Sequence, residues 1–132
     1  MPYKDIDIAK AAKAVIGNPD CFSVLSQFYN HLGIELLPYP NLIPTVRITN
    51  NPTRDSLIEK NEELYLYLKS LGQEVAFNYA IAGDLMIFGS QTCVFPGIYL
   101  GSDHLLCVFD KGAMVVPLKF FRQGLIEKRR IG

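Results

Sequence analysis

Apolar and polar positions at the front of the chain follow helical spacing in two short segments. Apolar residues recur every three or four positions over residues 5–16, and Gly17 follows as a stop signal. A second helix is predicted to begin after Asp20, a favourable N-cap residue, and to end at Gly33. The two predicted buried stripes are Ile8, Ala11, Ala12, Val15 and Ile16 in the first helix and Val24, Leu25, Phe28, Tyr29 and Leu32 in the second.

The middle of the chain has a different pattern. Four prolines, Pro38, Pro40, Pro44 and Pro52, lie between residues 34 and 52. Proline lacks a backbone N–H and biases the preceding residue toward extended conformations, so this stretch is predicted to be irregular, with at most a short strand at 46–49. A third amphipathic helix is predicted over 54–71. Its place between the front helices and the later strands indicates a helical insertion at 54–72.

Alternating or continuous apolar runs then fill the second half of the chain. These runs cover residues 84–89, 93–101, 104–109 and 113–118, and the turn-forming clusters GSQ, GSD and DKG separate them. They predict an antiparallel meander with the helices packed on one face, which makes the fold class α+β. The end of the chain, 119–132, is basic and is predicted to be a solvated C-terminal tail or a docking arm.

Composition narrows the classes of function. The 132 residues, 49% of them hydrophobic, suit one domain that spans 1–132. Thirteen basic residues balance 13 acidic ones, so we expect no nucleic-acid partner. No apolar run approaches the ~18 residues of a membrane span, and the N-terminus lacks the pattern of a secretory signal, so we expect no membrane span and synthesis in the cytoplasm.

Cysteines supply the candidate chemistry. Cys21 is predicted to lie in the first turn of the second helix, where the helix dipole and unpaired N–H groups stabilise a thiolate. Cys21, Cys93 and Cys107 form an odd set without short paired spacing, so reduced thiols and no cofactor are expected. An alternative is that the three thiols converge on a soft metal, although three ligands are one short of the usual structural zinc set.

Two blocks of sequence resemble the NlpC-type, papain-like cell-wall cysteine peptidases, in particular their phage-tail branch. The first block, DCFSVLSQFYNHLGIELLPYP, resembles the start of the family's nucleophile helix; the second block, AGDLMIFG followed by FPGIYLG, resembles two of its strands. The matching residues are Asp20, Cys21, Leu32, Gly33, Ile34, Leu36, Pro38 and Tyr39, and then Gly83, Asp84, Leu85, Phe88, Gly97, Ile98, Tyr99, Leu100 and Gly101. The resemblance covers residues 20–40 and 82–118 and implies an NlpC-type papain-like fold.

The resemblance implies a nucleophile at Cys21 but departs from the family at its partners. The family places a histidine where this chain has Phe95, to accept the thiol proton and later protonate the leaving amine. The third, orienting position falls on Cys107. Phenylalanine cannot move a proton. The two histidines of the chain, His31 and His104, lie elsewhere in the sequence, and His104 is the candidate for a substitute base.

We therefore expect a structural component of a bacteriophage tail tip, baseplate or related tail-like machine, built on a catalytically degenerate peptidase fold. Its expected partners are other tail-tip or hub proteins, its expected location is the virion tail, and peptidoglycan is a further candidate ligand. The competing hypothesis is an active peptidoglycan-cleaving endopeptidase or amidase that uses Cys21 during phage entry. A third is a bacterial regulatory or toxin-related module on the same fold.

Overall fold

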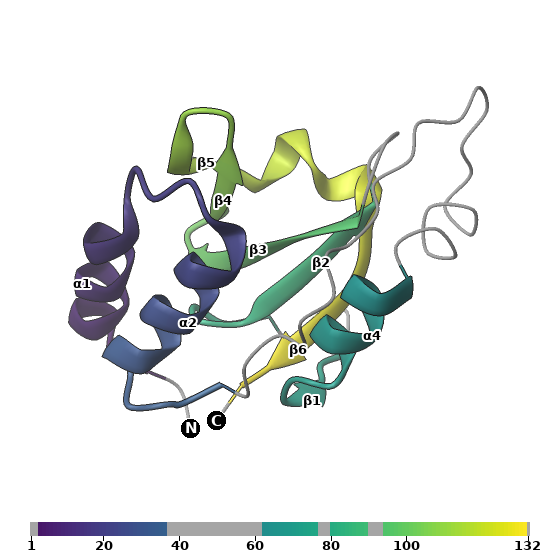
Figure 1. Ribbon diagram of the computed structural model, residues 1–132, viewed down its shortest axis with the longest axis horizontal. Helices are drawn as coiled ribbons and strands as arrows, with labels where there is room; N and C mark the ends of the chain where they lie inside the picture. Colours follow the sequence, from purple (N-terminus) through teal and green to yellow (C-terminus); the bar gives the residue numbers. More distant parts are fainter. Residues whose placement is uncertain (1–2, 37–61, 77–79, 90–93, 132) are drawn as a thin grey trace.

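The computed structural model describes residues 3–36, 62–76, 80–89 and 94–131 (Figure 1). The proline-containing stretch that begins at Pro38, the first part of the helix predicted over 54–71, and Cys93 lie outside these described residues.

In the part of the chain that the structure describes, three α-helices lie where the apolar spacing predicts them. They are α1 (Asp5–Val15), α2 (Cys21–His31) and α4 (Glu62–Lys69). The predicted stripes of α1 and α2 are buried except for Ile16, which is exposed, and Leu32, which is half-buried. Within the described ranges no helix combines the length and the apolar character that crossing a membrane requires.

An antiparallel sheet forms the other layer. Its strands are β1 (Gln73–Glu74), β2 (Leu85–Gly89), β3 (Val94–Gly101), β4 (His104–Phe109), β5 (Gly112–Pro117) and β6 (Leu125–Arg130). They are arranged in the order β1-β6-β2-β3-β4-β5. The stretch from β2 to β5 is the predicted meander, and the α+β class is confirmed.

The C-terminal segment differs from its prediction. The sequence predicts a solvated basic tail over 119–132, but β6 lies inside the sheet and pairs with both β1 and β2. The run of charges in this strand, EKRR, gives no strand signal in the sequence, because apolar and polar residues do not alternate there. The structure accommodates these charges through ion pairs, Arg130 with Asp84 and Arg129 with Glu127.

The sheet separates two apolar clusters. One cluster joins α1, α2 and α4 to one face of the sheet and includes Phe28, Leu68 and Ile98. The other lies on the opposite face, where Phe88 and Leu105 are among its buried members, and none of its described members belongs to α1, α2 or α4. Because successive side chains of a strand point to opposite faces, neighbouring residues of β2, β3 and β4 belong to different clusters.

The two ends of the described chain meet at one edge of the molecule (Figure 1). The Tyr3 hydroxyl donates a hydrogen bond to the carbonyl of Ile131, the residue after β6. Close by, the buried Tyr29 hydroxyl donates to the Gly83 carbonyl over 2.7 Å and ties α2 to the turn before β2. Burial raises the pKa of Tyr29 well above its ordinary value, which keeps this donor protonated.

Candidate functional site around Cys21

Helix α2 begins at Cys21, as the sequence predicts. The Asp20 carboxylate accepts a hydrogen bond from the Phe22 backbone N–H over 3.1 Å and caps the helix. The Ser23 hydroxyl accepts from the side chains of Asn18 and Gln27 over 3.1 and 2.9 Å, which adds a polar network to the first turn. Cys21 itself is a half-buried thiol at the positive end of the helix dipole.

Helix α4 lies beside this helix start. The Tyr67 ring of α4 makes an edge-to-face contact with Phe22 at a centroid separation of 6.2 Å. Burial raises the pKa of Tyr67, and the nearby charge of an ionised Cys21 raises it further. The sequence predicts the helix but gives no signal that Tyr67 neighbours Cys21, because that contact joins residues 46 positions apart in the chain.

Phe95, the residue at the position where the resemblance expects an imidazole, belongs to a group of four packed aromatic rings on the face away from the helices. Its ring stacks on Phe88 at a centroid separation of 5.3 Å and meets Phe121 edge-to-face at 6.1 Å. Phe109 joins from β4 and contacts Phe121 at 5.9 Å. Phe121 comes from the region predicted to be a tail, so the sequence did not indicate this contact.

Cys107, at the third position, is a buried thiol on the same face as Phe95. Its sulfur lies over Gly97, so close that a Cβ added to Gly97 would stand 2.9 Å from Sγ. Burial raises the pKa of Cys107 to about 12, and the nearby Cys21 contributes a smaller increase. The Cys107 side chain is therefore a neutral thiol at pH 7.

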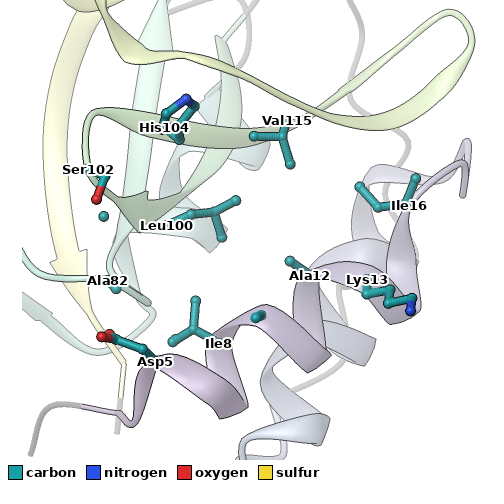
Figure 2. A pocket seen from close by; sticks show the side chains of 12 residues that line it. Asp5, Ile8, Ala12, Lys13, Ile16, Ala82, Leu100, Ser102, His104 and Val115 are labelled. Carbon is teal, nitrogen blue, oxygen red and sulfur yellow. The ribbon is translucent and has the colours of Figure 1, made fainter.

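The two histidines lie at the end of α2 and at the start of β4. His31 is the last residue of α2, and ten residues at a rise of 1.5 Å separate it from Cys21 by about 15 Å along the helix. His104 is exposed at the start of β4 and lines a cavity of about 650 Å³ between α1 and the β3–β4 turn, together with Ile8, Leu100 and Val115 (Figure 2). Cys21 does not line that cavity.

Metal-binding chemistry finds no support in the part of the chain that the structure describes, where no group of three or more His, Cys, Asp or Glu side chains is close enough to hold an ion. Cys21 and Cys107 are near enough to influence each other electrostatically. Cys93 lies outside the described residues, so the three-thiol arrangement stays a prediction.

Asp84, from the second resembling block, has a structural role. Its side chain is almost fully buried and accepts two hydrogen bonds from the Arg130 guanidinium, both at 3.0 Å. It also accepts from the Ile81 backbone N–H over 2.9 Å and so fixes the turn before β2.

Comparison with known proteins places this arrangement in a fold family. No family model matches the chain, and no curated protein matches it. Among solved structures, it superposes on a Staphylococcus aureus protein described as similar to a lipoprotein of the NLP/P60 family, with a TM-score of 0.61 and 21% identity. It also superposes on the NlpC/p60 domain of the peptidoglycan hydrolase SagA, with a TM-score of 0.59 and 17% identity. The chain has the NlpC/P60 fold.

The extent of these matches differs. All of this chain is covered in the S. aureus comparison but only 44% of that protein, so the chain spans less than half its length. The SagA domain is covered completely, with 98% of this chain. The same coverage holds for RipD from Mycobacterium tuberculosis, with a TM-score of 0.61 and 15% identity. RipD is described as a non-catalytic NlpC/p60 domain protein adapted to peptidoglycan binding.

Proposed function

We propose that this chain is a structural, non-catalytic NlpC/P60-fold component of a bacteriophage tail tip or a related tail-like machine. The observation that carries the proposal is the packing of Phe95. Phe95, which stands in the sequence where the resemblance expects an imidazole, has its ring stacked on Phe88 and in contact with Phe121, and a phenyl ring neither accepts nor donates a proton.

The other candidate proton carriers support the same proposal. His31 is about 15 Å along α2 from Cys21, and His104 lines a cavity that Cys21 does not line. The neutral Cys107 thiol is a weak hydrogen-bond donor and a poor orienter of a catalytic ring. Loss of general acid–base catalysis alone costs roughly 100- to 10,000-fold in rate.

The tail-machine part of the proposal rests on the resemblance over residues 20–40 and 82–118 to the phage-tail branch. The partners would be other tail-tip or hub proteins, and the location would be the virion tail after synthesis in the host cytoplasm. RipD offers a precedent for a non-catalytic protein on this fold.

An active cysteine peptidase is the second candidate, and one observation favours it. Cys21 stands at the start of a capped helix, the environment in which cysteine nucleophiles are activated. In that case Cys21 would attack a peptide bond of peptidoglycan, with His104 or a histidine from a partner chain as the base.

A digestion assay separates the two candidates. Purified chain and its Cys21→Ala variant are incubated with peptidoglycan, and soluble fragments are quantified by chromatography. We expect no fragments above background from either protein. Fragments released by the parent chain and not by the variant would establish the peptidase and overturn the non-catalytic proposal.

Mass spectrometry of purified tail particles tests the second part of the proposal. We expect peptides of this chain in the particles at a constant ratio to a known tail protein after repeated gradient purification. Its absence from purified particles, with its presence in the lysate, would contradict a structural role in the tail.

A further inference from the structure

A second, smaller cavity lies on the face of the sheet opposite α1, α2 and α4. It has a volume of about 280 Å³, and its apolar floor is formed by the side chains of Met86 and Leu118. Among the residues that the structure describes, its polar lining consists of Tyr99, Asp103, Arg122 and Lys128. Three of these four residues offer N–H or O–H donors, and they come from β3, β6 and the short helical turn Arg122–Gly124.

Lys128 is the buried member of this lining. In the register of β2 and β6 it lies opposite Met86, and only 8% of its surface is exposed. Burial lowers the pKa of Lys128, and the positive charge of Arg122 lowers it further, whereas Asp84 acts in the opposite direction. Two cationic side chains, Lys128 and Arg122, line this cavity together with the Asp103 carboxylate, and a bound negative charge would interact favourably with both cations.

Arg122 and Tyr99 complete the donor set at the mouth of the cavity. Arg122 forms an ion pair with Asp103 over 2.9 Å, and both side chains are about half exposed. This bond uses one of the five N–H donors of the guanidinium. The Tyr99 hydroxyl oxygen accepts a hydrogen bond from the Asp103 backbone N–H over 3.3 Å, and the hydroxyl group also carries an O–H donor of its own.

We propose that this cavity binds a compact oxyanion, a carboxylate or phosphate group, between the Lys128 ammonium, the Arg122 guanidinium and the Tyr99 hydroxyl. Charge-assisted hydrogen bonds from a lysine and an arginine are the strong contacts that such groups make in proteins. The apolar floor and the small volume exclude bulky ligands, and the Asp103 carboxylate at the rim holds Arg122 in place. This site is separate from Cys21 and does not depend on whether Cys21 is catalytic.

The test is a titration of the full-length chain with inorganic phosphate and, separately, with acetate, at pH 7 and constant ionic strength. Backbone amide shifts of Tyr99, Arg122 and Lys128 report binding by NMR. We expect saturable shifts with at least one of the two anions. Binding of phosphate alone, of acetate alone or of both would show whether the cavity binds phosphate groups, carboxylate groups or both.

Three variants make the test specific. Lys128→Met is expected to weaken binding about tenfold, because it removes a charged donor. Tyr99→Phe keeps the ring and removes only the hydroxyl, so it provides a milder second variant with an expected loss of several-fold. Lys119→Gln, which removes a nearby exposed cation outside the cavity, is the matched control with unchanged binding. No saturable shift with either anion, or equal weakening by Lys119→Gln and Tyr99→Phe, would overturn the proposal.

Discussion

At the scale of single residues, the buried thiol of Cys107 shows how packing within the sheet changes the pKa of a side chain. Gly97 leaves the space in which the sulfur sits, and the side chains of Phe88 and Leu105 also crowd that space. Water is excluded from the thiol, which raises the pKa of Cys107 to about 12. The same residue type is half-buried at Cys21, so the two cysteines have different reactivity.

Stability at high pH should depend on Cys107. An unfolded thiol ionises near pH 9, whereas the folded one holds its proton until about 12. The thiol's contribution is therefore fully present below pH 9 and is lost as the pH rises from 9 toward 12. Urea unfolding between pH 8 and 11 should show a steeper loss of stability in the parent chain than in Cys107→Ala. Parallel pH profiles for the two proteins would contradict this role of Cys107. Tyr29 is present in both proteins, so its ionisation does not affect the comparison.

Phe95 should contribute to stability through its ring contacts. Phe95→Ala removes the ring stacked on Phe88, and we expect a decrease of about 2 to 3 kcal/mol in the free energy of unfolding, since the ring is only partly buried. The matched control is Phe120→Ala, because that ring is 70% exposed and should change stability by less than about 0.5 kcal/mol. Equal effects of the two substitutions in denaturant titrations would refute the packing role.

At the scale of elements, the pairing of β6 with β2 is strengthened by a partly buried ion pair between Arg130 of β6 and Asp84, the residue before β2. The Asp84 side chain is 2% exposed and that of Arg130 is 33% exposed, and two hydrogen bonds of 3.0 Å join them. The hydrogen bond to Asp84 raises the pKa of Arg130, so the guanidinium stays charged. Removing one partner of such a pair leaves a poorly solvated charge behind.

Asp84→Asn should therefore destabilise the chain by about 3 kcal/mol. Asp103→Asn is the matched control: it removes the carboxylate of an exposed ion pair with Arg122, and it should cost less than about 1 kcal/mol. Asn also tolerates the positive φ of 62° at this position. Thermal or urea unfolding of both variants gives the comparison, and a larger loss in Asp103→Asn would contradict it.

At the scale of the whole molecule, the last strand completes the sheet. β6 separates β1 from β2, and Arg129 reaches across to the carbonyls of Leu71 and Gly72 over 2.8 Å. Tyr3 hydrogen bonds to the residue that follows β6. Hydrogen bonds of the C-terminal strand and of the residue after it thus join the N-terminal segment and the turn between α4 and β1 to the end of the chain.

A chain that ends at Gly124 should consequently fail to fold cooperatively, because the truncation exposes the edge of β2 and removes the partner of Asp84. Circular dichroism melts and amide NMR spectra should show a broad transition and poor dispersion. A dispersed spectrum and a sharp melt for the truncated chain would show instead that residues 125–132 are the dispensable tail that the sequence predicts.

Much of the fold could be predicted from short-range patterns. Helical spacing located α1 and α2, Asp20 identified the helix start at Cys21, and alternating apolar runs located the strands from β2 to β5. The expected NlpC-type α+β fold is confirmed. In contrast, β6 was missed because its charges are stabilised by residues far away in the chain, as with Arg130 and Asp84.

By itself, the sequence determined the capped helix that begins at Cys21, the meander and the presence of Phe95 where the resemblance expects an imidazole. Only the tertiary structure decided that Phe95 stacks on Phe88, that Tyr67 lies beside the start of α2, and that Lys128 lines a cavity with Arg122. The physical reason is the distance along the chain over which each interaction acts. Capping and periodicity act over a few residues, whereas burial, ion pairing and pKa depend on which distant segments the sheet brings into contact.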